Sequence, residues 1–270
     1  FKQKTAYEIG VRLVGSEMCI RDRLLHEANG ELSLHFNFPT IQSRMLKVDP
    51  DRLVLDYTRT MMGFLLLQPK PKRIVMIGLG GGSLAKYCRR TLPNSEFIAV
   101  ELSDEVIALR DEFRIPPDGP RFRVLCGDGA EYLRGDAGLA DVLLIDGFDS
   151  EGQPPGLCSP AFYDNCYAKL NAGGVLVVNL CANDSACGCY VGRIRSAFDE
   201  KCVVVDAEDG DNKIVFAQKC NTFPPGFNEL TERLRKLETI HRVDLDKTAQ
   251  GMLRQERKRR WGRKATKQKA

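Results

Sequence analysis

The segment IVMIGLGGGSLAKY, residues 74–87, carries the pattern from which the fold can be predicted. It begins as a continuous apolar run, passes through four glycines within five residues, and continues into residues that favour a helix. A strand that ends in a glycine turn and leads into a helix is typical of α/β domains that bind nucleotides or nucleosides. Glycines at such a turn let a ligand approach the main chain, because no Cβ atom stands in the way.

Strands and helices alternate through residues 71–220, which we predict to form one Rossmann-like nucleoside-binding catalytic domain. Continuous apolar strands such as DVLLID and GVLVVNL are typical of a parallel sheet that is covered on both faces. The sequence therefore predicts an α/β fold with a doubly wound, mostly parallel sheet. The predicted strands are 73–78, 96–101, 121–126, 141–146, 174–180, 202–206 and 213–218, and the predicted helices are 83–92, 103–113, 129–134, 160–170 and 188–199.

Smaller elements flank this domain on both sides. Residues 24–70 are predicted to form a small β element, with strands at 31–36 and 40–46, and then one helix within 50–67. Residues 221–253 are predicted to hold an amphipathic C-terminal helix, because apolar side chains recur there at helical spacing. Those side chains are Phe227, Leu230, Leu234 and Leu237.

The first 23 residues, FKQKTAYEIGVRLVGSEMCIRDR, show no sustained helical or strand period. They are similar to the translated read-through of a sequencing adapter, so we predict residues 1–23 to be a non-native or disordered segment. An extra helix at 4–14 is the alternative.

Composition limits the classes of protein that fit. A chain of 270 residues with 43% hydrophobic content can bury a full core. No stretch approaches the roughly 20 apolar residues of a membrane span, and no secretory signal pattern is present, so we expect a cytoplasmic protein without membrane contact. The ten cysteines form no pair of CxxC motifs, so we expect reduced thiols and no metal site, even at Cys181, Cys187 and Cys189.

Charge is unevenly distributed along the chain. The net charge is +4, yet nine Lys or Arg residues and one Glu lie within 254–269. A basic tail of this kind can hold nucleic acid by releasing counterions from phosphates. A solvated end is the favoured interpretation, so residues 254–270 are predicted to be a basic disordered tail.

The glycine turn favours a particular class of ligand. In open α/β sheets, ligands bind outside the carboxyl ends of the strands, where this turn lies. Gly78, Gly80 and Gly82 satisfy the spacing GxGxG, whereas the dinucleotide pattern GxGxxG would need glycine at Ser83. This spacing favours an adenosyl-sulfonium ligand over a pyrophosphate.

Two further strand ends carry groups that suit an adenosyl ligand. Glu101 ends the second predicted strand, where a carboxylate can accept hydrogen bonds from both ribose hydroxyls. Asp128 and Gly129 follow the third strand, where the Asp128 carboxylate can receive the adenine amino group, cap the following helix, or do both.

A fourth strand end indicates the chemistry. Asp146 and Asp149 follow strand 141–146, and two acids beside a sulfonium suit an amine as the second substrate. A primary amine has a pKa near 10 and is protonated at neutral pH, so it must lose a proton to act as a nucleophile. A carboxylate can bind the ammonium and accept that proton while nitrogen attacks the carbon next to sulfur. A plain loop turn is the alternative role for this pair.

These blocks together resemble the spermidine synthase (polyamine aminopropyltransferase) family. PKPKRIVMIGLGGGSLAKY, VELSDEVIAL, GDGAEYL, VLLIDGFD and FYDNCYAKLNAGGVLVVNL follow one another as in that family, across about residues 31–218. The resemblance implies a class I methyltransferase-like Rossmann fold and a homodimer. It also implies that decarboxylated S-adenosylmethionine, or its product methylthioadenosine, binds at Gly78, Gly80, Gly82, Glu101, Asp128 and Gly129. By the same resemblance Asp146 would accept the proton, Asp149 would hold the diamine, and Gln42 would contact the nucleoside.

Three positions depart from the family pattern. FNFP replaces a leucine-aspartate-glycine turn, and DYTRTMM replaces a Tyr-x-Glu segment, with Tyr57 in its neighbourhood and no Glu. GLGGGS replaces GGGDGG, so an acid near the aminopropyl end of the donor is missing. The residues expected to bind the nucleoside therefore match the family pattern better than the residues expected to bind the amine. A methyltransferase that uses intact S-adenosylmethionine and a binding protein without turnover stay open as alternatives.

Overall fold

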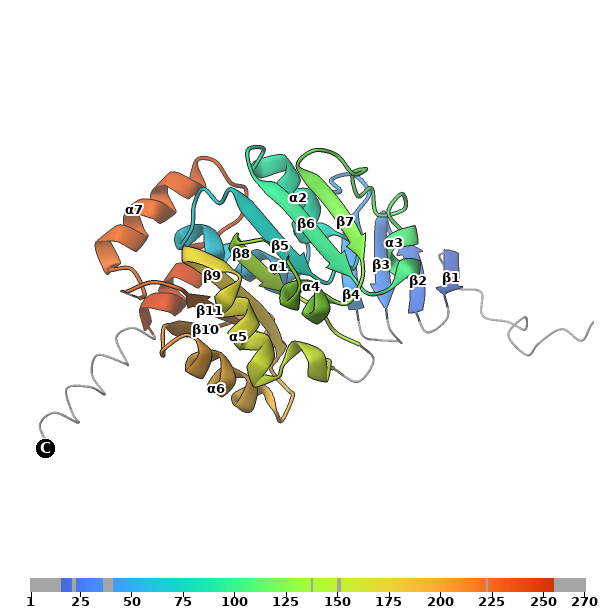
Figure 1. The fold of residues 1–270 in the computed structure, drawn as a ribbon. Coiled ribbons are helices and arrows are strands. Elements are labelled where there is room, and N and C mark those ends of the chain that lie inside the picture. Colours follow the sequence, from blue (N-terminus) through green and yellow to red (C-terminus); the bar gives the residue numbers. More distant parts are fainter. Residues whose placement is uncertain are drawn as a thin grey trace, which may run out of the picture.

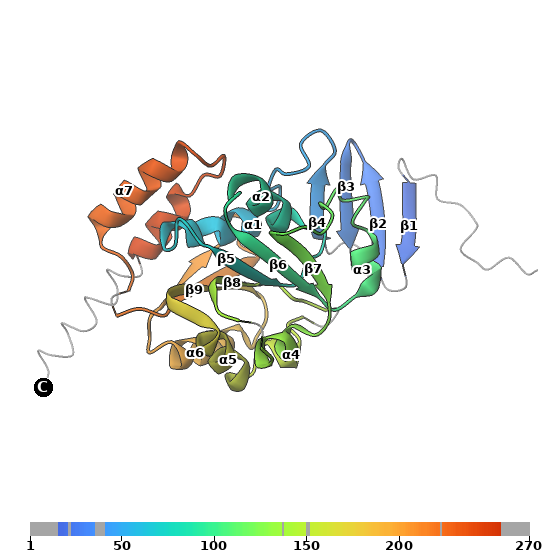
Figure 2. The same ribbon diagram turned by 45° about the horizontal axis from the view of Figure 1, so that its top comes forward.

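Two β-sheets and their helices make up the described part of this computed structural model, which comprises residues 16–20, 23–35, 41–136, 138–149, 152–221 and 223–254. The N-terminal sheet has four antiparallel strands in chain order. They are β1 (Ser16–Ile20), β2 (Arg23–Ala28), β3 (Glu31–His35) and β4 (Ile41–Leu46). Figures 1 and 2 show this sheet at one end of the molecule, next to α3 and β7.

The main sheet has seven strands in the order β10-β11-β9-β8-β5-β6-β7. The pairs from β9 to β7 are all parallel, and β11 runs antiparallel to both β9 and β10. Strand order reverses at β5 and β8, so the carboxyl ends of these two neighbours form the switch point where such folds bind ligands. The strands are β5 (Arg73–Ile77), β6 (Glu96–Glu101), β7 (Phe122–Cys126), β8 (Ala140–Ile145), β9 (Leu170–Cys181), β10 (Cys202–Asp206) and β11 (Asn212–Gln218).

Helices cover both faces of the main sheet (Figure 2). Side chains of β5 alternate between the two faces: Ile74 and Met76 join one buried cluster, and Val75 and Ile77 join the other. The helices of the second face are α4 (Gly129–Arg134), α5 (Pro160–Ala168) and α6 (Cys187–Ala197). Those of the first face are α1 (Asp56–Met61), the 3-10 helix η2 (Met62–Leu66), α2 (Ser83–Thr91), α3 (Asp104–Ala108) and α7 (Phe227–Glu238).

The predicted alternation of strands and helices is confirmed through the whole main sheet. Strands 96–101 and 202–206 and helix 129–134 have the predicted bounds, and most other ends differ by one or two residues. The larger differences are an earlier start of β9, at Leu170, and a shorter α3, which ends at Ala108. A further 3-10 turn, η3 (Pro155–Leu157), precedes α5.

The flanking elements differ more from the prediction. The helix expected within 50–67 begins only at Asp56 and tightens into η2, whose Gly63 packs so closely that a Cβ atom would lie 2.5 Å from Thr248 Cγ2. Residues 246–254 form an additional helical segment after α7. In α7, Leu230 and Leu237 are buried, and Phe227, at the start of the helix, is exposed.

The segment 1–23 contains regular structure that the sequence pattern did not predict. Residues 16–20 form β1, which pairs with β2 along its whole length. A strand therefore lies inside the segment that we predicted to be non-native or disordered, and the origin of this segment stays a prediction. The proposed helix at 4–14 and nearly all of the basic tail, 255–270, lie outside the described residues.

Candidate functional site

The glycine turn lies at the carboxyl end of β5, in contact with the end of β8. Gly78, Gly80 and Gly82 all have positive φ, at 90°, 52° and 64°. A Cβ atom on Gly78 would lie 2.3 Å from the main-chain oxygen of Asp146. Only glycine fits this position, because the backbone is left-handed and the next strand end is in direct contact.

The N-terminal sheet holds the glycine turn from the other side. The main-chain N–H of Gly81 donates to Ser43 Oγ on β4 at 2.8 Å. Gln42, the preceding residue, has a buried side-chain oxygen with no hydrogen-bond partner among the described residues. Its main-chain oxygen accepts a 3.3 Å hydrogen bond from the Tyr57 hydroxyl. The predicted position of Gln42 beside the site is thus supported by its neighbours, and its unpaired amide oxygen can serve a ligand.

Glu101 connects the glycine turn to the end of β6. Its carboxylate accepts hydrogen bonds from the main-chain N–H groups of Leu79, at 2.8 Å, and Ser103, at 3.0 Å, one on each oxygen. Each carboxylate oxygen has further acceptor capacity. This arrangement fixes the carboxylate and leaves it able to accept hydrogen bonds from ribose hydroxyls.

Asp128 and Gly129 lie at the end of β7 and the start of α4. Asp128 Oδ1 accepts from the main-chain N–H groups of Ala130 and Glu131, at 2.7 and 3.0 Å, so the predicted helix cap is present. The Asp128 side chain is exposed, which leaves its second oxygen available to a ligand. A Cβ atom on Gly129 would lie 2.2 Å from Ile77 Cγ2, so this glycine lets α4 pack onto β5.

Asp146 follows β8 and is the most perturbed acid of the site. Its main-chain N–H donates to Ile77 O at 2.9 Å, and its Oδ1 accepts from Asn179 Nδ2 at 2.8 Å. Burial raises the pKa of Asp146 to about 6, and the negative charge of Glu101 also raises it, whereas hydrogen bonds from Asn179 and Tyr57 lower it. A carboxyl with this pKa is ionised at neutral pH and can still accept a proton.

Tyr57 and Asn179 are the side chains that reach Asp146 from other elements. Burial, followed by the charge of Asp146 and a hydrogen bond to it, raises the pKa of Tyr57 well above its ordinary value, so Tyr57 stays protonated, and its single O–H proton serves either Asp146 or Gln42 O. Asn179 lies on β9 with its side chain buried, and its Oδ1 accepts from Asn212 Nδ2 at 2.9 Å. Sequence reasoning noted Tyr57 only by location and missed Asn179 and Asn212. The available signal was one amide residue inside the apolar run GVLVVNL.

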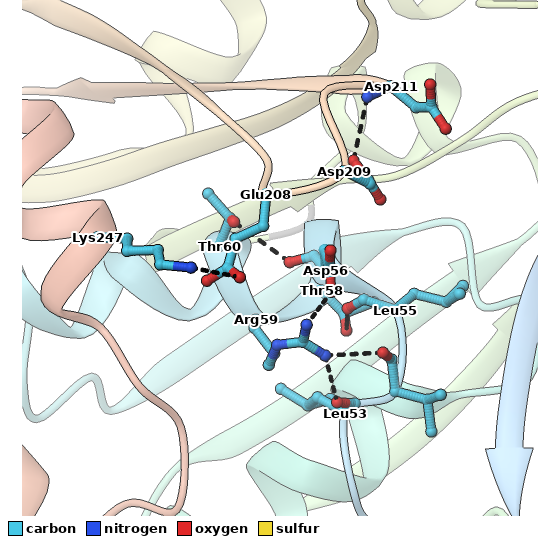
Figure 3. A network of polar contacts seen from close by, with 11 residues as sticks. Leu53, Leu55, Asp56, Thr58, Arg59, Thr60, Glu208, Asp209, Asp211 and Lys247 are labelled. Atoms are coloured by element: carbon cyan, nitrogen blue, oxygen red, sulfur yellow. Dashed lines mark hydrogen bonds and ion pairs between the residues drawn. The ribbon is translucent and has the colours of Figure 1, made fainter.

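A polar network stabilises the start of α1, the helix to which Tyr57 belongs (Figure 3). Arg59 donates to the main-chain oxygens of Leu53, at 3.1 Å, and Val54, at 2.7 Å, and forms an ion pair with Asp56. These bonds hold the turn before α1 against the first helical residues. Figure 3 also places the β10–β11 turn, with Glu208 paired to Lys247, beside this helix.

Asp149 is the member of the predicted acid pair that the structure leaves at the surface. It is exposed, and its main-chain N–H donates to Gly152 O at 2.9 Å within a turn. The structure therefore places Asp149 in an exposed turn, whereas Asp146 lies in the hydrogen-bond network with Asn179. The role of Asp149 toward an amine stays a prediction.

The cysteines form no disulfide among the described residues. Nine are free thiols, of which Cys88 and Cys202 are buried and Cys126 is exposed. Cys126 lies on the same face of β7 as the buried Phe122 and Val124, but it is the last residue of the strand and is exposed there. Within the described ranges there is no group of three or more His, Cys, Asp or Glu that could hold a metal ion, and no helix long and apolar enough to cross a membrane.

Comparison with known proteins agrees with this geometry. The chain matches no profile of a known protein family. It is 36% identical over 207 residues to the polyamine aminopropyltransferase of Chromobacterium violaceum, and the alignment covers 76% of this chain and 79% of that relative.

Two solved structures show the same fold. A spermidine synthase in complex with the transition state analogue AdoDATO has a TM-score of 0.67 at 21% sequence identity, covering 88% of this chain and 84% of that one. Human methyltransferase-like protein 13 in complex with SAH has a TM-score of 0.63 at 23% identity, covering 68% and 91%. These similarities confirm the predicted methyltransferase-like α/β fold.

Proposed function

Because this chain belongs to the polyamine aminopropyltransferase family, we propose that it moves an aminopropyl group from an adenosyl-sulfonium donor to a small polyamine such as putrescine. The observation that carries the proposal is the convergence of three groups. The glycine turn contacts Asp146, and Glu101 holds the same turn through Leu79. A nucleoside and a basic carboxylate can therefore meet at one edge of the sheet.

In the proposed reaction the chain supplies position and a proton acceptor. Glu101 and Asp128 hold the ribose and the adenine, and Gln42 contacts the nucleoside from β4. The acceptor binds as an ammonium ion and loses one proton to the Asp146 carboxylate. The free amine nitrogen then attacks the carbon beside sulfur, the carbon–sulfur bond breaks, and its electron pair neutralises the sulfonium to give methylthioadenosine. Positioning of the two reactants contributes much of the rate.

Decarboxylated S-adenosylmethionine is the proposed donor. Four acids, Glu101, Asp128, Asp146 and Asp149, follow strands at this edge of the sheet. Their field favours a donor that carries an ammonium group and repels the carboxylate of intact S-adenosylmethionine. The chain lacks the family acid in the glycine turn, so we assign attraction of the donor ammonium to these four acids together.

The test is product analysis with two donors and a matched pair of variants. Purified protein is incubated with putrescine and either decarboxylated or intact S-adenosylmethionine, and products are identified by mass spectrometry. We expect methylthioadenosine and spermidine from the decarboxylated donor only. Asp146→Asn should lower the rate at least about 100-fold, as expected for loss of a general base. Asp141→Asn, at the opposite end of β8, is the control and should keep the activity.

Other products would contradict the proposal. Transfer of a methyl group from intact S-adenosylmethionine would identify a methyltransferase, and tight binding of methylthioadenosine without turnover would identify a binding protein. Full activity of Asp146→Asn would remove Asp146 from the mechanism.

A homodimer and a cytoplasmic location are also part of the proposal. The family resemblance supports the dimer, and light scattering of the purified chain tests it. Contact with nucleic acid through residues 254–270 is not favoured, and a salt-dependent shift in an RNA-binding assay would revive it.

A further inference from the structure

Two asparagine side chains form a line of hydrogen bonds that ends on Asp146. Asn212 Nδ2 donates to Asn179 Oδ1 at 2.9 Å, and Asn179 Nδ2 donates to Asp146 Oδ1 at 2.8 Å. The three residues come from β11, from β9 and from the end of β8, which are neighbours in the sheet. The line therefore crosses the sheet from the β10–β11 turn to the candidate site.

Core packing does not explain Asn179. It is 2% exposed, and its chain neighbours Val178 and Leu180 are fully buried apolar residues. Asparagine is disfavoured in strands, and a buried amide that lacks partners costs about 1–3 kcal/mol. Here both ends of the amide are bonded. A valine or leucine would suit this apolar strand, so the hydrogen bonds of the Asn179 amide, and not its packing, explain the residue at this position.

Asn212 contributes to the orientation of the Asn179 amide group. An amide group has one donor end and one acceptor end, and it can rotate to exchange them. Because Asn212 donates to the oxygen of Asn179, the nitrogen of Asn179 is turned toward Asp146. The opposite rotation would bring an amide oxygen against a carboxylate oxygen. The Asp146 carboxylate, which only accepts, therefore requires this orientation of Asn179, and Asn212 stabilises it by bonding the Asn179 oxygen without touching Asp146.

We propose that Asn212 and Asn179 are positioning residues that fix Oδ1 of Asp146, so that its carboxylate meets the substrate amine in one orientation and in ionised form. This inference rests on the proposed role of Asp146 as the proton acceptor. The groups that face Asp146 from the surrounding elements are Asn179 on β9, Tyr57 on α1 and Glu101 on β6. Asn179 and Tyr57 stabilise the ionised form through hydrogen bonds, and Glu101 opposes it by charge repulsion.

The pH dependence of the rate gives a readout that a merely structural role would not change. Burial raises the pKa of Asp146, and the hydrogen bond from Asn179 lowers it. Loss of that bond should raise the pKa further and move the acid limb of kcat/KM to higher pH. Affinity for methylthioadenosine should stay unchanged, since neither asparagine contacts the nucleoside-binding residues.

The experiment compares three variants with one matched control. Asn212→Ala should move the acid limb up by about half a unit to one unit and lower kcat about 10-fold, because Asn179 loses the hydrogen bond that stabilises its orientation toward the Asp146 carboxylate. Asn179→Ala should move it further. Asn179→Asp should move it furthest, because two adjacent carboxyls cannot both ionise easily. Asn171→Ala is the control: Asn171 Nδ2 donates to Asp141 Oδ1 at 2.8 Å, an equivalent bond at the opposite end of β8 and β9.

The outcomes separate this inference from the proposed function. If the acid limb of kcat/KM is unchanged in Asn212→Ala and Asn179→Ala, while Asp146→Asn still loses activity, only this inference is overturned and the proposed function stands. An equal shift in Asn171→Ala would also overturn it. If Asp146→Asn keeps activity, the proposed role of Asp146 as proton acceptor fails. The carboxyl titration of Asp146, followed by carbon-13 NMR in the absence of substrate, then still decides whether Asn212 acts on it. If the Asn179 variants do not fold, Asn212→Ala with this titration carries the test.

Discussion

Replacement of Gly78 by alanine should damage folding and catalysis together, because this residue touches the candidate catalytic strand end. The new Cβ atom would lie 2.3 Å from Asp146 O, whereas ordinary contacts begin at 3.4 Å, so the two strand ends must separate by about 1 Å. The positive φ adds about 1–2 kcal/mol, and the steric overlap adds about 1–3 kcal/mol. We therefore expect a loss of about 2–5 kcal/mol in the free energy of unfolding.

The same displacement should lower the rate of the folded variant. A reacting group that is misplaced by about 1 Å can cost about 100-fold in rate. Gly173→Ala is the matched control: Gly173 also has a left-handed backbone, with φ of 79°, but a Cβ atom there would meet nothing within 4 Å. It should lose only about 1–2 kcal/mol and keep its activity.

Urea unfolding and steady-state kinetics measure the two effects separately. The folded fraction of each variant is set by its unfolding curve, and kcat is then corrected for that fraction. Equal destabilisation of the two variants, or full activity of folded Gly78→Ala, would show that the contact between Gly78 and Asp146 does not hold the site.

Three more predictions concern the same network. The kcat/KM of the native enzyme should rise as pH increases through about 6, the pKa of Asp146. Because this pKa lies above the ordinary 3.8, protonated Asp146 stabilises the fold below about pH 4, and about 3 kcal/mol of the free energy of unfolding is lost as pH rises past 6. Urea unfolding at several pH values measures this loss, and Asp146→Asn should abolish it. Tyr57→Phe should move the acid limb to higher pH and Glu101→Gln to lower pH, since these groups shift the pKa of Asp146 in opposite directions; shifts of the same sign in the rate profiles would contradict this. Ser43→Ala should cost about 1–3 kcal/mol and weaken methylthioadenosine binding in calorimetry, because the buried N–H of Gly81 loses its acceptor; unchanged affinity would show that β4 does not shape the turn.

Local pattern was sufficient to predict the strands, the helices and the strand ends that carry Gly78, Glu101, Asp128 and Asp146. Apolar runs, glycine spacing and helix caps are properties of neighbouring residues, so they can be read along the chain. The topology then follows, since the carboxyl ends of parallel strands share one edge. The prediction differed from the structure at β1, which forms a hairpin with β2, and at α1, which begins only at Asp56.

By itself the sequence determined the class of fold, the family and the acids at the strand ends, because these depend on periodicity and on short motifs. Only the tertiary structure decided which acid is desolvated and what controls it. Burial, with the charge of Glu101, raises the pKa of Asp146, whereas hydrogen bonds from Asn179 and Tyr57 lower it, and these three residues belong to three other elements. Burial and hydrogen bonding act across space between residues far apart in the chain, and no local pattern records them.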